Sequence, residues 1–275
     1  MINEILNTKK AAWENSPLIH SITNPISIND CANFVLSAGG KPIMAEHPLE
    51  CADITKNASA LALNIANITD ARMQSIKISA KTAENCGIPS IIDAVGVTCS
   101  KLRLDYINAL LADTHVSAIK GNIAEIRALL GKHTETVGID VKKGERNIKE
   151  DIDDVKTLAK KYGCVVMASG KTDIITDGEK TALVSNGRPE MSLVTGTGCV
   201  LNVLAATYMS QSNAFTGCVT AAVIFGICGE LAEHKNGMAS YRINMLDKLY
   251  TLTDNEIRTN IKLSETTEKV PFLTN

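Results

Sequence analysis

Thr195-Gly196-Thr197-Gly198-Cys199 stands directly before an apolar segment with helical spacing. Its two glycines let backbone amides approach a ligand closely, and the first turn of a helix offers unpaired N–H groups at the positive end of the helix dipole. Such a turn suits a phosphoryl group in transfer, which spreads negative charge over its oxygens. The motif predicts an anion-binding turn, although similar turns also open many helices that bind no ligand.

Cys199 would occupy the N-terminus of that helix, where the dipole favours a thiolate. We therefore expect it to be the most reactive cysteine of the chain. Three roles are open: a base or hydrogen-bond partner for a substrate hydroxyl, a covalent nucleophile, or simple packing. The nucleophile is the least favoured role, because it would need a partner histidine and no histidine has a recognisable local signature.

Charged and polar residues follow several other apolar runs. Asp93 is the last residue of the apolar run 90–93. At the carboxyl end of a strand it could bind Mg²⁺ or phosphate, or it could only cap a turn. Lys120 could neutralise phosphate. Asn122 with Glu125 has the spacing of a capping box, which does not exclude a function, since Glu125 could also orient a metal-bound water. Ser169 adds a hydroxyl that could line a nucleotide pocket.

The first apolar run ends in hydrogen-bonding groups from His20 to Asn24, and the second ends at Met44. A soft methionine beside an asparagine could bind a small aromatic ring with polar edges, although methionine at a strand end is more often part of the core. Four other histidines show no metal-ligand spacing and are expected to be surface or satisfied residues: His47, His115, His133 and His234.

Short apolar, β-branched runs indicate buried strands at residues 18–23, 61–65, 90–93, 116–119 and 164–168. Segments with helical spacing lie between them, at residues 30–38, 71–86, 104–111, 122–130 and 153–162. Alternation of this kind predicts an α/β fold with a central, mostly parallel sheet and helices on both faces.

The pattern changes after Lys171. Residues 172–176 and 180–185 flank Asp177-Gly178, which is a strong hairpin signal. Two apolar helices are expected next, at residues 200–209 and 215–234, both in the core. The tail from Ser264 is polar and is expected to be frayed or bound to the surface.

The charge pattern and the most apolar stretch limit the domain organisation and the classes of partner that the chain can have. The charge-rich stretch 142–161 is expected to be a solvated loop and helix face, so residues 1–275 form one domain. A net charge of −2 gives no electrostatic footprint for nucleic acid or an anionic membrane. The apolar stretch 217–229 falls short of the roughly 20 residues that a spanning helix needs.

The eight cysteines are scattered and include no C-x-x-C pair. Neither a zinc site nor a disulfide scaffold is indicated, and several cysteines lie inside apolar runs, as free thiols in a reducing compartment do. Residues 1–10 lack the apolar core of a signal peptide. The sequence therefore predicts a cytoplasmic protein.

Taken together, the motifs resemble the hydroxyethylthiazole kinase family over residues 17–234, most of the chain. The resemblance is carried by an ordered set of segments: Pro17-Leu18-Ile19-His20-Ser21-Ile22-Thr23-Asn24, Pro42-Ile43-Met44-Ala45, Leu63-Asn64-Ile65, Ile92-Asp93, Lys120-Gly121-Asn122 with Glu125, and Thr195-Gly196-Thr197-Gly198-Cys199.

The resemblance implies a ribokinase-like fold in which MgATP phosphorylates the primary alcohol of 4-methyl-5-(2-hydroxyethyl)thiazole, in thiamine biosynthesis or salvage. It also implies a homotrimer with active sites between subunits, where the Asn24 region of one chain faces the Gly196 region of another. The implied roles are catalytic for Cys199, substrate-binding for Met44, Gly196, Asn24 and Thr195, ATP-binding for Lys120, Ser169, Asn64 and Gly198, and metal-binding for Asp93 and Glu125.

The chain departs from the usual family pattern at four positions: Ala66 stands for glycine, Ala94 for proline, Lys120 for a frequent arginine and Ser169 for threonine. The lysine keeps the charge but loses bidentate geometry, and we expect altered affinities with the chemistry retained.

Three alternatives remain open. They are a kinase for another heterocyclic alcohol, a ribokinase-like dehydratase that repairs hydrated nicotinamide cofactors, and a module that binds ATP without turnover. Relatives of the first two classes usually carry aspartate where Cys199 stands, which argues against both.

Overall fold

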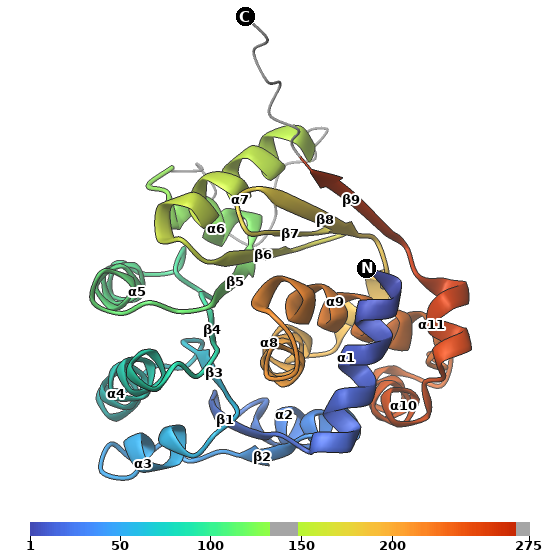
Figure 1. Cartoon of the computed structure of the whole chain (residues 1–275), viewed down its shortest axis with the longest axis horizontal. Coiled ribbons are helices and arrows are strands. Elements are labelled where there is room, and N and C mark those ends of the chain that lie inside the picture. Colours follow the sequence, from blue (N-terminus) through green and yellow to red (C-terminus); the bar gives the residue numbers. More distant parts are fainter. Residues whose placement is uncertain (133–147, 268–275) are drawn as a thin grey trace, which may run out of the picture.

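In the computed structural model, which describes residues 1–132 and 148–267, nine strands form one sheet (Figure 1). Their order across the sheet is β2-β1-β3-β4-β5-β6-β7-β8-β9. The strands are β1 (Leu18–Ile22), β2 (Lys41–Ile43), β3 (Ala60–Asn64), β4 (Ser90–Asp93), β5 (Ala118–Asn122), β6 (Val165–Ser169), β7 (Asp173–Thr176), β8 (Lys180–Val184) and β9 (Leu263–Thr267).

The pairings from β2 to β6 are all parallel, and those from β6 to β9 are antiparallel. The predicted hairpin is confirmed, because β7 and β8 pair around Asp177-Gly178. Gly178 has φ 97°, and Asp177 Oδ1 accepts hydrogen bonds from the backbone N–H groups of Glu179 and Lys180. The turn chemistry read from the sequence therefore sets this reversal.

The expectation of a frayed tail is wrong for residues 264–267. They belong to β9, which pairs antiparallel with β8 from Lys180 to Val184. An edge strand needs only one hydrogen-bonded neighbour and can leave polar side chains in water, so its sequence carries little apolar signal. Residues 268–275, the rest of that tail, lie outside the described residues.

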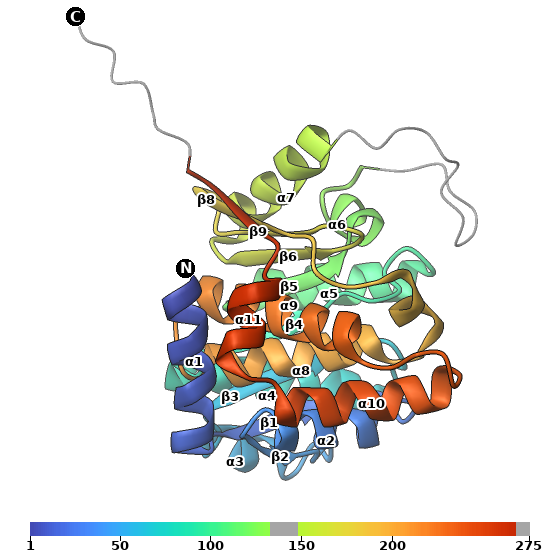
Figure 2. The ribbon, with the colours of Figure 1, turned by 90° about the vertical axis from the view of Figure 1, so that its right-hand side faces the viewer.

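Helices cover both faces of the sheet, as Figures 1 and 2 show. The outer face carries α3 (Cys51–Lys56), α4 (Asp70–Cys86), α5 (Lys101–Asp113), α6 (Ile123–Leu129) and α7 (Ile148–Tyr162). The opposite face carries α2 (Ile28–Ser37), α8 (Thr197–Met209) and α9 (Ala214–Leu231), with α1 (Ile2–Asn15), α10 (Met238–Thr251) and α11 (Asp254–Asn260) packed outside them.

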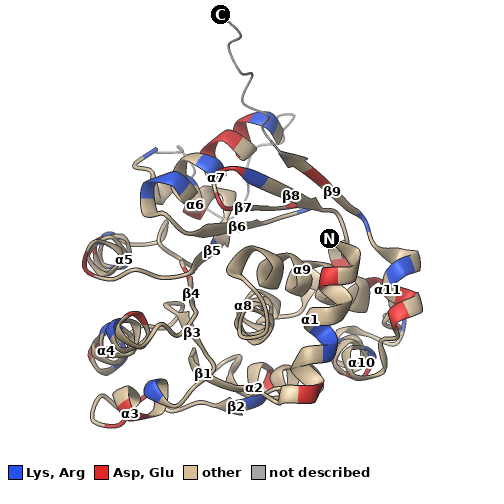
Figure 3. Cartoon of the chain, viewed as in Figure 1, with Lys and Arg blue, Asp and Glu red and all other residues tan. Residues whose placement is uncertain are grey.

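The strands and helices expected from the hydrophobic pattern are present, with ends displaced by a few residues. The charge-rich stretch is helix α7 from Ile148 onward, and residues 142–147 lie outside the described residues. Figure 3 shows acidic and basic residues mixed along α4 and α7, in keeping with the net charge of −2.

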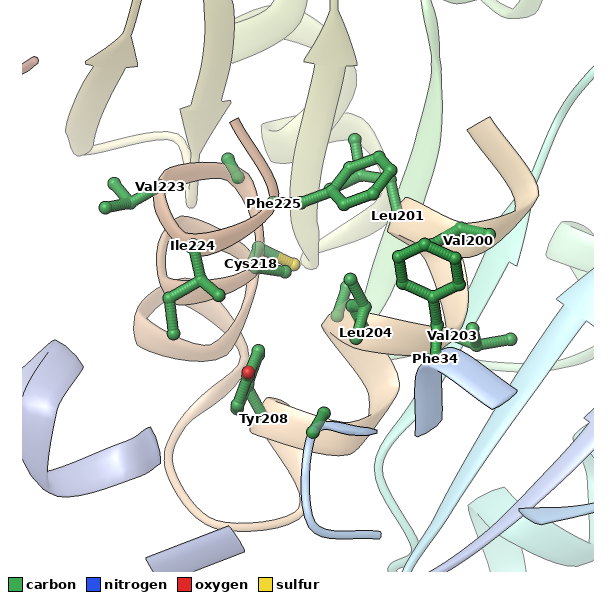
Figure 4. Close-up of a cluster of buried hydrophobic side chains, with 14 of the residues drawn as sticks. Phe34, Val200, Leu201, Val203, Leu204, Tyr208, Cys218, Val223, Ile224 and Phe225 are labelled. Carbon is green, nitrogen blue, oxygen red and sulfur yellow. The ribbon is translucent and has the colours of Figure 1, made fainter. Parts of the chain in front are cut away.

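Helices α8 and α9 form the centre of one hydrophobic core, drawn in Figure 4. Phe34 of α2 and Phe225 of α9 meet edge to face, with 5.6 Å between ring centroids. Helix α9 is long and apolar enough to span a membrane, but 83% of it is buried inside the fold. This confirms the expected core helix.

Strand β3 explains how closely α8 approaches the sheet. Its alanines, Ala60 and Ala62, face the α8 side, whereas Leu61 and Leu63 belong to the core on the other face. Small side chains under α8 allow the helix to lie close to the strands. Asn202 of α8 donates a hydrogen bond to the Leu63 carbonyl at 3.0 Å, which ties the helix to the end of β3.

Candidate active site

The carboxyl ends of the parallel strands bring the predicted residues together at one edge of the sheet. Asn64 pairs in register with Asp93 on the next strand, and Asp93 pairs with Lys120 on the strand after that. Ser169 lies opposite Asn122 at the end of β6. Because these strands are parallel and adjacent, residues far apart in the chain become neighbours.

Asp93 and Lys120 form a buried ion pair, with 2.9 Å between Oδ2 and Nζ. Burial raises the pKa of the Asp93 carboxyl, and the ammonium of Lys120 acts in the opposite direction. Burial also opposes the charge on Lys120, but the carboxylates of Asp93 and Glu125 outweigh it and raise the pKa of the ammonium. Each charge is therefore held in place chiefly by the other.

Glu125 lies in the first turn of α6 and closes the predicted capping box, because Asn122 accepts from its backbone N–H and Glu125 Oε2 accepts from that of Asn122. Its Oε1 accepts from the backbone N–H of Gly96 at 2.8 Å. Burial raises the pKa of Glu125, and these two N–H groups oppose the shift. The carboxylate is thus fixed beside Asp93.

The part of the site formed by Asp93 and Glu125 has one oxygen atom available to bind a metal ion. Asp93 Oδ1 is buried and has no hydrogen-bond partner, so it remains available as a ligand. Within residues 1–132 and 148–267, no group of three or more His, Cys, Asp or Glu side chains has metal-binding geometry. This donor set suits Mg²⁺, which usually takes one or two carboxylates together with water and substrate phosphates.

The glycine-rich turn begins helix α8 over these residues. Gly196 is its N-cap, with φ 91° and no capping side chain, so the first N–H groups of the helix are left for a ligand. A Cβ on Gly198 would lie 3.5 Å from Lys120 Nζ. The ammonium therefore lies directly under the turn, which gives the predicted anion site both a dipole and a charge.

Cys199 is half-buried in the first turn of α8. Its sulfur lies 3.2 Å from Asn24 Nδ2 and 3.4 Å from Asn64 Nδ2. A Cβ on Gly196 would lie 3.0 Å from that of Ser27. The Asn24 and Gly196 regions thus meet within one chain, and the expected contact between them across a subunit boundary stays a prediction.

A buried histidine, His20, fixes the backbone that follows strand β2. His20 Nδ1 is hydrogen-bonded to Thr55 Oγ1 at 2.9 Å and Nε2 to the Ala45 carbonyl at 2.8 Å. Burial lowers the pKa of this imidazole, and the Ala45 contact opposes the shift. Met44 is half-buried and packs against the α8 and α9 core. His20 therefore anchors the backbone that carries Met44.

Three of the other histidines are exposed or hydrogen-bonded, as predicted from the sequence. His47 and His115 are exposed, and His234 is hydrogen-bonded to Arg188. His133 lies outside the described residues.

A cavity of about 710 Å³ opens beside the turn. Ser169 and Gly198, both predicted to bind ATP, are among the residues that line it, whereas Thr195 is exposed and does not line it. Its further walls were not foreseen from the sequence, and they include Asp173, Arg188, Met191, Leu201, Ala222 and Phe225. These residues come from separate segments with no local motif, so only the fold brings them together.

Asp173, at the start of β7, contributes a titratable group to this cavity. Burial raises the pKa of its carboxyl to about 6, although the hydrogen bond from the Gly170 N–H opposes the shift. Apolar walls and a few polar groups of this kind are typical of small-molecule pockets.

Comparison with known proteins gives a matching family and similar proteins within it. The model of the hydroxyethylthiazole kinase family matches residues 10–255. A protein of Clostridium botulinum described as hydroxyethylthiazole kinase 2 is 48% identical over 90% of this chain and 95% of its own length. The hydroxyethylthiazole kinase of Clostridium perfringens is 40% identical over 90% of this chain and 96% of its own length.

Solved structures also resemble this chain. The hydroxyethylthiazole kinase of Pyrococcus horikoshii superposes with a TM-score of 0.88 at 30% identity, covering 96% of this chain and 99% of that protein. Pyridoxal kinase of Staphylococcus aureus, at 12% identity and a TM-score of 0.61 over 91% of this chain and 98% of its own, shares the fold alone. With a ribokinase-like fold, a family match over most of its length and relatives near half identity, this chain belongs to the hydroxyethylthiazole kinase family.

Proposed function

We propose that this protein uses ATP to phosphorylate the primary alcohol of 4-methyl-5-(2-hydroxyethyl)thiazole, a reaction of thiamine biosynthesis or salvage. The observation that carries the proposal is the grouping of Cys199, Asp93 and Lys120 under one glycine-rich turn, beside a cavity of about 710 Å³. The family relatives at 40–48% identity support the same substrate.

The nucleotide would lie in the cavity lined by Ser169 and Gly198, with its phosphates toward Lys120 and the N-terminus of α8. Lys120 already faces that turn and would exchange Asp93 for phosphate oxygens. Asn64, assigned to the nucleotide site by resemblance, joins Asp93 to Cys199 at this end of the cavity. Positioning and charge neutralisation of this kind supply most of the catalysis of phosphoryl transfer.

Asp93 and Glu125 would hold Mg²⁺, with Asp93 Oδ1 as the available ligand. When bound, the cation neutralises charge on the transferring phosphoryl group. The protein's own part is to keep these carboxylates apart from water, which it does by burying both.

The thiazole alcohol would lie on the Cys199 side of the turn, against Met44, Thr195 and Gly196. Its oxygen forms the new bond to the γ-phosphorus as the bond to ADP breaks, and the Cys199 sulfur, reacting as a thiolate, takes the hydroxyl proton and becomes a thiol. A thiol is a weak base, yet a loose transition state places little demand on base strength.

Assembly and location complete the proposal. Three large apolar side chains near this end of the sheet are exposed, namely Ile26 (71%), Leu49 (88%) and Leu193 (67%). Burying them between subunits would give the homotrimer implied by the resemblance. All eight cysteines are free thiols, which supports a cytoplasmic location.

The direct test is ADP release with MgATP and a panel of hydroxyethylthiazole, hydroxymethylpyrimidine, pyridoxal and ribose. Turnover confined to the thiazole alcohol, with a large loss in Cys199→Ala, is the expected result. Preference for another alcohol would overturn the substrate, and ATP binding without turnover on any alcohol would overturn the enzyme.

A further inference from the structure

Two asparagine side chains converge on the Cys199 sulfur from separate elements. Asn24 follows β1, Asn64 ends β3, and Cys199 lies in the first turn of α8. The Nδ2 atoms approach Sγ to 3.2 and 3.4 Å, and the two side chains are only 4% and 2% exposed. The fold thus directs two buried amide N–H groups at one sulfur atom.

The orientation of each amide is fixed by the backbone. Asn24 Oδ1 accepts hydrogen bonds from the N–H groups of Ile26 and Ser27, at 3.1 and 3.2 Å. Asn64 Oδ1 accepts from the N–H of Ala66 at 2.9 Å. A backbone N–H can only donate a hydrogen bond. Turning either amide over would therefore bring its NH₂ group, also a donor, against a backbone N–H. The groups that face the sulfur are therefore N–H groups.

Neither amide keeps a donor for a substrate. Asn24 Nδ2 lies within hydrogen-bond distance of Cys199 Sγ and of Asn64 Oδ1, and Asn64 Nδ2 within that distance of Asp93 Oδ2 and Cys199 Sγ. Each NH₂ group has two hydrogens, and each has two acceptors. An incoming alcohol would find these groups already engaged.

Two N–H donors on one sulfur favour negative charge there, since hydrogen bonds to an ionised acceptor are stronger than those to a neutral one. We propose that Asn24 and Asn64 are positioning residues, which hold the Cys199 sulfur in place by donating hydrogen bonds to it, without contacting the thiazole alcohol. This inference rests on the proposed function for the role of Cys199 in turnover, but its effect on the thiol can be measured without any substrate.

The informative variant is Asn24→Asp. One carboxylate oxygen can still accept from Ile26 and Ser27, while the other replaces the N–H donor with an acceptor aimed at the sulfur. Asn24→Ser removes the donor without adding charge. Asn33→Asp, on α2 with only local hydrogen bonds to Asn29, makes the same charge change away from the sulfur and is the matched control.

The first readout is alkylation of Cys199 by iodoacetamide, followed on its peptide by mass spectrometry. The exposed thiols Cys86 and Cys99 give internal reference rates in the same molecules. We expect the rate of Cys199 relative to Cys86 to fall about tenfold in Asn24→Asp, less in Asn24→Ser, and to stay unchanged in Asn33→Asp.

The second readout separates kcat from KM. Positioning predicts that kcat falls in Asn24→Asp while KM for the alcohol changes less than twofold. A rise in KM with an unchanged alkylation ratio would show that Asn24 binds substrate and would overturn the inference, as would variants indistinguishable from the parent. Absence of thiazole turnover in the parent protein would overturn the proposed function alone, because the alkylation ratio still decides the role of the asparagines.

Discussion

Asp93 is the residue on which the two halves of the site depend. Its Oδ2 accepts from Lys120 on one neighbouring strand and from Asn64 on the other, and its Oδ1 is buried without a partner. The carboxylate therefore connects the phosphate side of the site, through Lys120, with the thiol side, through Asn64.

Removing one charge of this pair tests its dependence on the other. Lys120→Met should lower the free energy of unfolding by about 3–5 kcal/mol, because it leaves a buried carboxylate unpaired. Lys120→Met combined with Asp93→Asn should recover most of that loss, since neither charge of the pair is then left without its partner. Chemical denaturation of both variants measures the difference, and equal losses in the single and double variants would contradict it.

A half-buried carboxyl, that of Asp173, gives a pH dependence of stability. The pKa of Asp173 is raised from 3.8 to about 6 in the fold, so the folded protein holds a proton that the unfolded chain loses first. Stability due to this group is present below pH 3.8 and is lost as pH rises toward 6.

Asp173→Asn removes that loss while keeping an oxygen for the Gly170 N–H. We expect the variant to be more stable than the parent above pH 6, by on the order of 1–2 kcal/mol, and equal to it near pH 4. Unfolding midpoints across pH 4–8 check this. Asp105→Asn, an exposed site on α5, should show no such trend, and a constant offset for Asp173→Asn would refute the assignment.

At the scale of elements, α9 and residues 185–193 form one wall of the cavity. A Cβ on Gly226 would lie 2.6 Å from Asn186, and one on Gly229 would lie 2.3 Å from the Met191 sulfur. Two glycines one turn apart therefore let this segment lie directly on the helix, with Met191 and Arg188 facing the cavity.

Paired substitutions in α9 separate packing from ligand binding. Gly226→Ala should destabilise the fold and raise KM for ATP several-fold, because the segment at Asn186 must move. Gly217→Ala creates an equal overlap of 2.6 Å, with Met209, away from the cavity. It should destabilise similarly and leave KM for ATP unchanged. The test is a comparison of unfolding and steady-state kinetics, and equal KM values would reject this role for residues 185–193.

Local sequence predicted the elements that carry their own signal. Asp177-Gly178 specified a hairpin, and continuous apolar runs specified buried parallel strands. Helices α1, α3, α10 and α11 were not predicted. Helix α3 has six residues, and α1 buries Ile5, Leu6 and Ala12 in an otherwise polar segment. The apolar positions of α1, α10 and α11 gain meaning only once α9 supplies a surface to cover, and those of α3 only once α4 does.

At the scale of the whole molecule, the same limit applies to the site. Asp93, Lys120 and Ser169 could be foreseen because parallel strand ends always gather at one edge. The cavity walls could not, because Asp173, Met191 and Phe225 are brought together by the packing of the hairpin and α9. The contact of Asn24 with Cys199 within one chain belongs to the same class.

The proposed trimer makes a prediction for the whole assembly. Leu193→Arg should shift the molar mass measured by light scattering from trimer toward monomer, because a charge would replace an apolar side chain in the subunit contact. Leu102→Arg, at a similarly exposed leucine on α5, is the matched control and should leave the mass unchanged. A monomeric parent protein, or an unaffected Leu193→Arg variant, would reject this interface.

The buried pair of Asp93 and Lys120 also has a thermodynamic consequence. With the two charges of the pair already compensated inside the protein, Lys120 is not an unpaired cation waiting for a nucleotide. Under the proposed function, nucleotide binding would then be an exchange of counterions: Lys120 would turn to the phosphates, and the carboxylate that it leaves would need a new cation. Free ATP alone would strand that carboxylate, whereas MgATP compensates both groups at once. Metal and nucleotide binding should therefore be coupled, each strengthening the other by the same factor.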